Sequence, residues 1–170
     1  MEAKITIVEK QLVVFNLGKE AYAVDISMVR EIIQMQAITQ IPGMFHSVEG
    51  VINLRGAVIP IVDLRKRFKL ARIENDKNTR IVVVNCKEMD VGVIVDSVAE
   101  VLRIPIDSIE SAANLFTTEH IEHLLGIVKL QNKLIILLDM KQVLSSQEAA
   151  VISSMDLTKT EKTSKEPALV

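Results

Sequence analysis

The stretch Gly50–Leu64 reads GVINLRGAVIPIVDL, and a related stretch, GIVKLQNKLIILLDM, follows at Gly126–Met140. Aligned without a gap, the two copies share Gly, Leu, Ile and Asp at four positions, and most other pairs are apolar in both. Internal similarity of this kind is typical of a fold built from two copies of one unit. The copies differ at their polar centre, where Lys, Gln and Asn replace Asn53, Arg55 and Gly56.

A shorter echo supports the duplication, because the segment 29–32, VREI, corresponds to 98–101, VAEV. The polar segment 75–78 between the copies is a natural boundary. We therefore expect one domain over residues 1–145, with a first lobe at about 11–75, a second at about 79–145, and termini that can cross between them. Residues 146–170 form a C-terminal extension. It is expected to be disordered at least from residue 156, because it becomes charged and rich in Ser and Thr.

Short apolar runs and abundant Val and Ile predict mainly β-structure, since branched side chains suit a pleated surface. Runs at 11–17 and 21–24 flank a turn and predict one hairpin, and runs at 81–86 and 91–95 predict another. Ser27 is expected to cap a helical turn at 28–31, and Asp63 a short helix at 64–69. This pattern predicts two small antiparallel barrels packed together, with an open sandwich as the alternative.

The composition argues against several classes of partner. A net charge of −2 and few aromatic residues (four Phe, one Tyr, no Trp) give little attraction to nucleic acid or anionic lipid. The first residues lack signal-peptide architecture, and no apolar run approaches the length of a membrane span. The single cysteine, Cys86, excludes an intrachain disulfide. A soluble, cytoplasmic protein is expected.

Two aspartates in register, Asp63 and Asp139, allow an aspartic-protease-like pair sharing one proton. Their flanking sequences, VDLR and LDMK, lack the following Ser or Thr and Gly of such a site. Helix capping explains both carboxylates with fewer assumptions. A hydrolase therefore stays an alternative, as does a small-ligand or oligonucleotide module on barrels of this kind.

Other candidate chemistry is weaker still. The spacing of His120 and His123 would put both imidazoles on one helical face, but His46 is the only other histidine. Cys86 lies in a predicted buried strand, which favours packing over reactivity. No glycine-rich phosphate loop or nucleophile-elbow motif occurs. No metal site, cofactor or catalytic residue is predicted.

The repeated stretch resembles the signature of the CheW family of chemotaxis coupling proteins. The family pattern G-V-x-N-L-R-G-x-x-x-P-(I/V)-x-(D/N)-L is met throughout at 50–64. Further matching pieces follow the family order: GKEAYA at 18–23, VxEI at 29–32, IP at 41–42, VGVIVD at 91–96, VxEV at 98–101 and GI at 126–127. The similarity extends from about Gln11 to Leu144.

The resemblance implies two five-stranded, SH3-like β-barrel lobes with a few short helices. It implies a non-enzymatic adaptor, recruited to membrane receptor arrays, that joins the cytoplasmic tip of methyl-accepting chemotaxis receptors to the regulatory domain of the chemotaxis histidine kinase. The same module occurs in the kinases themselves and in fused coupling–receiver proteins. The sequence after Leu144 is too short for either, so the stand-alone adaptor is expected.

The resemblance also implies a receptor-binding groove. Its matched positions are Val29, Glu31, Asn53, Arg55 and Gly56, with Val98 and Val101 on the opposite wall and Gly50 as a structural turn. We hypothesise that Glu31 and Arg55 form an ion pair, because a guanidinium can bind a carboxylate with two parallel hydrogen bonds. The alternatives are that Arg55 reaches solvent from a turn, and that Val98 and Val101 belong to the core.

Overall fold

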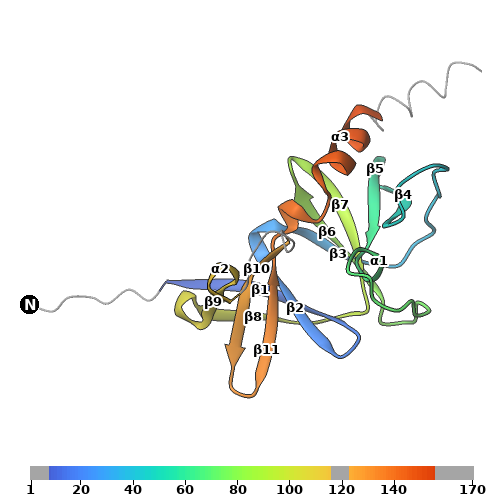
Figure 1. The fold of residues 1–170 in the computed structure, drawn as a ribbon. Coiled ribbons are helices and arrows are strands. Elements are labelled where there is room, and N and C mark those ends of the chain that lie inside the picture. Colours follow the sequence, from blue (N-terminus) through green and yellow to red (C-terminus); the bar gives the residue numbers. More distant parts are fainter. Residues whose placement is uncertain (1–7, 116–122, 156–170) are drawn as a thin grey trace, which may run out of the picture.

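The computed structural model describes residues 8–115 and 123–155, and its strands form two sheets (Figure 1). The six-stranded sheet contains β1 (Glu9–Leu17), β2 (Glu20–Asp25), β8 (Ser97–Pro105), β9 (Ile109–Ser111), β10 (Leu124–Leu130) and β11 (Lys133–Leu138). The five-stranded sheet contains β3 (Val29–Gln34), β4 (Val48–Leu54), β5 (Ala57–Asp63), β6 (Arg80–Cys86) and β7 (Met89–Val95). We call these parts the six-stranded lobe and the five-stranded lobe. The mainly-β prediction is confirmed.

The short helical elements lie between or after the strands. The α-helices are α1 (Leu64–Arg67), α2 (Ala112–Leu115) and α3 (Ser146–Met155). The 3-10 turns are η1 (Ile26–Met28), η2 (Ile106–Ser108) and η4 (Met140–Gln142).

The two sheets share one topology, with strand orders β8-β1-β2-β11-β10-β9 and β3-β6-β7-β5-β4. Each sheet has a central antiparallel hairpin. In the six-stranded sheet this is β1–β2, and β1 pairs with β8; in the five-stranded sheet it is β6–β7, and β6 pairs with β3. On its other side, each central hairpin pairs in parallel with the last strand of a second hairpin, β11 or β5. The duplication in the sequence is therefore a duplication of strand order. As hydrogen-bonded ladders, the described strands leave both sheets open, so barrel closure is not seen.

The chain path differs from the expected division near residues 75–79. After β2 the chain crosses to the other sheet, builds the whole five-stranded sheet over residues 29–95, and returns at Asp96 to finish the six-stranded sheet. Parallel neighbours cannot be joined by a tight turn, so β2 and β11, like β5 and β7, come from distant parts of the chain. Each sheet thus combines strands from both halves of the sequence.

The largest apolar cluster combines both lobes. The alternation of β1 sends Val13 and Phe15 into this shared cluster, and Leu12 and Val14 into a smaller cluster of the six-stranded lobe. Strand β6 does the same, with Val82 and Val84 in the shared cluster and Ile81 and Val83 in the cluster of its own lobe. Because both faces of these hairpins are buried, their sequences are continuous apolar runs.

Two capping predictions have different outcomes. Residues 28–31 do not form a turn capped by Ser27. Instead η1 ends at Met28, and the Asp25 side chain caps it by accepting a hydrogen bond from the Ser27 amide at 2.9 Å. Asp63 does cap α1, accepting from the Arg65 amide at 2.9 Å, although the helix is shorter than predicted.

Helix α3 was not predicted, and it packs against the five-stranded lobe. Ser145 and Glu148 form a reciprocal capping box, in which the Ser145 amide donates to Glu148 Oε1 at 2.8 Å and the Glu148 amide donates to Ser145 Oγ at 3.1 Å. The Glu148 carboxylate is buried and also accepts from Ser47 Oγ at 3.0 Å, and it pairs with Arg67 at 2.8 Å. Residues 156–170, expected to be disordered, lie outside the described residues.

Candidate functional site

The tip of the β4–β5 hairpin is a two-residue turn made by Arg55 and Gly56. Both residues have positive φ, 52° and 89°, as a tight hairpin turn of the mirror-image type requires. The Asn53 side chain accepts a hydrogen bond from the Gly56 amide at 2.8 Å. Gly56 therefore supplies the predicted turn conformation, and Asn53 holds the turn.

Arg55 pairs with Glu31, as hypothesised: its Nη2 contacts Glu31 Oε2. Hydrogen bonding to Glu31 raises the pKa of Arg55. Glu31 lies on β3 and Arg55 follows β4, and these are the two edges of the five-stranded sheet. The pair therefore joins the edges of a curled sheet at an exposed position, with 69% of the Arg55 side chain accessible.

Gly50 is required by the backbone, but it lies within β4 at a register shift and not at a turn. Its φ is 146°, and a Cβ there would overlap the backbone carbonyl of Thr39, whose amide and carbonyl pair with Val51. The repeat counterpart behaves alike, since a Cβ at Gly126 would overlap the carbonyl oxygen of Glu110. Because glycine has no side chain, a neighbouring segment can approach the bulged strand closely at both positions.

The apolar candidates lie in both lobes. Val29 on β3 and Val98 on β8 are half-buried and pack against the cluster shared by the two lobes. Val101, opposite Val13 in the ladder, is 53% exposed. The structure thus brings Glu31 of β3 close to Asn53, Arg55 and Gly56 at the β4–β5 tip, where the two edges of the five-stranded sheet are joined, and places Val98 and Val101 on the edge strand of the other lobe.

With this geometry in place, comparison with known proteins becomes informative. Residues 11–148 match the family model described as the CheW-like domain. The chain belongs to this family.

Two relatives are similar over most of their length. The chain is 35% identical to the chemotaxis protein CheW of Klebsiella aerogenes, with 87% of this chain and 89% of the relative covered. It is 36% identical to the chemotaxis protein CheW of Bacillus subtilis, with 88% and 95% covered. The crystal structure of the scaffolding protein TtCheW from Thermoanaerobacter tengcongensis is 37% identical with a TM-score of 0.76, and the match covers 83% of this chain and 96% of that one.

The structure of this CheW-like domain supports neither a hydrolase at Asp63 and Asp139 nor a reactive Cys86. Asp63 and Asp139 each cap a short helix, accepting from the amides of Arg65 and Lys141, and they follow strands of different sheets. The Cys86 side chain is buried in the shared cluster, and burial raises the pKa of its thiol.

A metal site at the histidines is not supported either. Over residues 8–115 and 123–155, no three His, Cys, Asp or Glu side chains group as metal ligands. His120 lies outside the described residues, and the ring of His123 stacks on Phe68 with centroids 4.8 Å apart.

Within the described residues, no helix is long and apolar enough to cross a bilayer.

Proposed function

We propose that this CheW-like protein is a non-enzymatic adaptor that couples methyl-accepting chemotaxis receptors to the chemotaxis histidine kinase and helps control kinase activity. Its relatives in Klebsiella aerogenes and Bacillus subtilis are named chemotaxis proteins, and the Thermoanaerobacter tengcongensis neighbour is described as a scaffolding protein. The observation that carries the proposal is the Glu31–Arg55 pair, because it joins two residues of separate family motifs at an exposed position, across the two edges of the five-stranded sheet.

The proposed groove has one polar and one apolar wall. The polar wall is the edge of the five-stranded lobe, with Val29, Glu31, Asn53, Arg55 and Gly56. The apolar wall is β8 of the other lobe, with Val98 and Val101. A receptor helix in this groove would present apolar side chains at i, i+3, i+4 and i+7 spacing. The exposed part of Arg55 is free to contact acidic or carbonyl groups of that helix.

The control of the kinase would be thermodynamic. An adaptor without catalytic groups changes another protein's activity only by contacting one of its states more favourably than the other. The expected output is a coupling free energy between receptor and kinase. The second partner is the regulatory domain of the kinase, and the protein would work in the cytoplasm at receptor arrays.

The decisive experiment is co-sedimentation of the purified protein with receptor-containing membranes and kinase, together with kinase autophosphorylation. We expect the wild-type protein to sediment with the membranes and to change autophosphorylation. Sedimentation with neither partner would overturn the proposal.

An Arg55→Ala variant tests the proposed site, with Arg30→Ala as its control. Arg30 is also an exposed arginine in an exposed ion pair, but its partner is Asp90 of β7, which is not part of the proposed groove. We expect Arg55→Ala to lose receptor coupling with the fold intact, and Arg30→Ala to keep it. Equal behaviour of the two variants would remove Arg55 from the site.

A further inference from the structure

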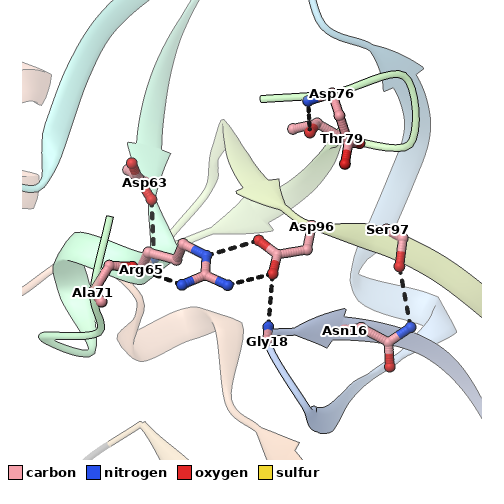
Figure 2. A network of polar contacts seen from close by, with 9 residues as sticks. All are labelled: Asn16, Gly18, Asp63, Arg65, Ala71, Asp76, Thr79, Asp96 and Ser97. Carbon is pink, nitrogen blue, oxygen red and sulfur yellow. Dashed lines mark hydrogen bonds and ion pairs between the residues drawn. The ribbon is translucent and has the colours of Figure 1, made fainter. Parts of the chain in front are cut away.

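A half-buried polar network lies where the chain passes from one lobe to the other (Figure 2). Asp96 is the residue between β7 of the five-stranded lobe and β8 of the six-stranded lobe. Its Oδ1 accepts from Arg65 Nε at 2.8 Å, and its Oδ2 accepts from Arg65 Nη2 at 2.5 Å and from the Gly18 amide at 2.6 Å. We call this network the inter-lobe bridge.

The inter-lobe bridge connects three segments that are distant in sequence. Arg65 belongs to α1, directly after β5 of the five-stranded lobe, and Gly18 is in the β1–β2 turn of the six-stranded lobe. Arg65 is itself held by a hydrogen bond from Nη1 to the Ala71 carbonyl at 2.6 Å. Asn16 adds two further hydrogen bonds. Its carbonyl accepts from the Asp96 amide at 3.0 Å, and its side-chain amide donates to Ser97 Oγ at 3.1 Å.

We propose that Arg65 and Asp96 are positioning residues that fix the orientation of the two lobes and, with it, the spacing of the two walls of the receptor groove. This inference rests on the proposed function. Neither residue is part of the proposed groove. Asp96 ends the matched VGVIVD piece, but no sequence pattern indicates that it pairs with Arg65.

The Arg65–Asp96 pair is better suited to fix the orientation of the lobes than the shared apolar cluster is. The shared cluster resists separation of the lobes, but the hydrophobic effect is non-directional and does not by itself specify one orientation. A guanidinium fork on a carboxylate is directional, and this one is only 12% exposed on Arg65 and 20% on Asp96. Burial alone would raise the pKa of Asp96, but the hydrogen bonds from Arg65 and the Gly18 amide lower it, which shows how well the charged form is held.

The other crossing between the lobes has no such bridge. There, Asp25 bonds to the Ser27 amide next to it and pairs with Lys10 of β1 at 3.4 Å, so its side-chain contacts do not reach the five-stranded sheet. The repeat counterpart of Arg65 is Lys141, which is exposed. One crossing is therefore fixed by a fork, and the other is a short 3-10 turn.

The inter-lobe bridge lies next to the start of one groove wall and is connected to the other through β5. Val98 lies two residues after Asp96, at the start of β8. Arg65 follows β5, the hairpin partner of β4, and that hairpin carries Arg55 at its tip. A rotation at the bridge would shift Val98 and Val101 relative to Arg55 without breaking the Glu31–Arg55 pair.

Backbone amide residual dipolar couplings of the full chain, analysed separately for the strands of each lobe, measure the lobe orientation. We expect a single alignment tensor to fit both lobes of the wild-type protein. In Arg65→Ala, Arg65→Lys and Asp96→Asn the lobes should need different tensors, since Lys cannot form the fork. In receptor-membrane co-sedimentation we expect these variants to bind at least threefold more weakly than the wild type.

The control is Arg80→Ala. Arg80 is also a half-buried arginine, but it donates to the Lys77 and Thr79 carbonyls beside it, so its loss should leave lobe orientation and receptor binding unchanged. A single tensor for both lobes in the Arg65 and Asp96 variants would overturn the inference, as would binding equal to that of Arg80→Ala. Should Arg65→Ala not fold, Arg65→Lys and Asp96→Asn decide by the same criteria. Failure of the wild type to bind receptor membranes would overturn the proposed function and the groove role with it, whereas the tensors would still report on the bridge.

Discussion

The β4–β5 hairpin and its repeat counterpart, β10–β11, have the same frame and different tips. Both have a bulge at a glycine, a residue with positive φ at the turn (Arg55 or Gln131), and an aspartate that caps the next helical turn. Beside β10 lies the three-residue strand β9, whereas beside β4 the Thr39–Val51 bridge takes the equivalent place, and the Glu31–Arg55 pair connects the hairpin tip to β3.

This difference separates architecture from function. The shared glycines and aspartates maintain two similar sheets, while the hairpin tip of the five-stranded lobe carries Asn53, Arg55 and Gly56 where the other lobe has Lys129, Gln131 and Asn132. Exposed edges are recurrent docking positions for partners. The comparison indicates that divergence at one hairpin tip, on a shared frame, is the origin of the proposed receptor site.

The largest effect should come from the shared frame, at Gly50→Ala. A Cβ there would overlap the Thr39 carbonyl, and the φ of 146° is unfavourable for any side chain. We expect a loss of about 3 kcal/mol in the free energy of unfolding, measured by urea denaturation. Gly126→Ala should cost less, since only the overlap with the Glu110 carbonyl applies. A smaller loss at Gly50 than at Gly126 would contradict the equivalence of the two bulges.

The next effect concerns a feature that only the five-stranded lobe has. Glu148→Ala removes the carboxylate that joins α3 to Arg67 and Ser47, and leaves the Ser47 hydroxyl without that acceptor. Loss of these contacts should destabilise the protein by about 2–3 kcal/mol. The measurement is urea denaturation, with Gln147→Ala, an exposed residue of the same helix, as the control. Equal stability of the two variants would show that α3 is held by its apolar residues alone.

Sequence patterns predicted the local features and missed those that depend on distant segments. Alternation and turn residues identified the hairpins, and an aspartate before a short helix identified the Asp63 cap. The parallel pairing of β2 with β11 and of β5 with β7 has no local signature, so termini that cross between the lobes were expected but the positions of the crossings were not predicted.

The candidate site divides in the same way. The Glu31–Arg55 pair could be predicted because both residues lie in matched family motifs. The inter-lobe bridge was not predicted, because Asp96 ends the matched piece at 91–96 but no motif indicates Arg65 as its partner. Helix α3 had a signal, the S-x-x-E capping box at 145–148, but the segment lacks a clear apolar period and was treated as an extension.

The two chain crossings should differ in their response to acid and salt. In folded Asp96 and Asp25, burial would raise the pKa, but hydrogen bonds from Arg65 and Gly18, or from Ser27 and Lys10, lower it. A carboxylate with a lowered folded pKa stabilises fully above its unfolded value of about 3.9, and this stabilisation is lost as pH falls through the folded pKa. Wild-type stability should therefore fall more steeply below about pH 4 than that of Asp96→Asn or Asp25→Asn.

The stabilisation by Asp96 and the stabilisation by Asp25 should respond differently to salt. Both partners of the Lys10–Asp25 pair are more exposed than those of the inter-lobe bridge, so ions screen it more strongly. At pH 7, Asp96→Asn should cost about 1.5–2 kcal/mol in low and high salt alike, whereas the smaller cost of Asp25→Asn should shrink in high salt. Chemical denaturation with urea, which is uncharged, measures both. A salt dependence at Asp96 as strong as at Asp25 would mean that the bridge is open to solvent.

The smallest effect on stability, and the most specific one on function, is expected at the hairpin tips. Asn53→Ala removes the acceptor for the Gly56 amide, so the turn that holds Arg55 at positive φ loses its side-chain support. The loss in the free energy of unfolding should be about 1 kcal/mol. Receptor binding should fall further than stability, because Arg55 would sample positions away from Glu31, and amide hydrogen exchange at Gly56 should accelerate.

The control is Lys129→Ala, at the equivalent position of the other lobe. Lys129 is exposed and precedes a turn that also has a residue with positive φ, Gln131. Lys129→Ala therefore tests whether loss of any side chain at this strand position weakens receptor binding. We expect unchanged receptor binding and stability. Asn53→Asp retains a side-chain oxygen for the Gly56 amide and should recover most of the binding that Asn53→Ala loses. If Asn53→Asp and Asn53→Ala bind equally poorly, the amide of Asn53 contacts the receptor itself, and the two hairpin tips differ in direct recognition as well as in the positioning of Arg55.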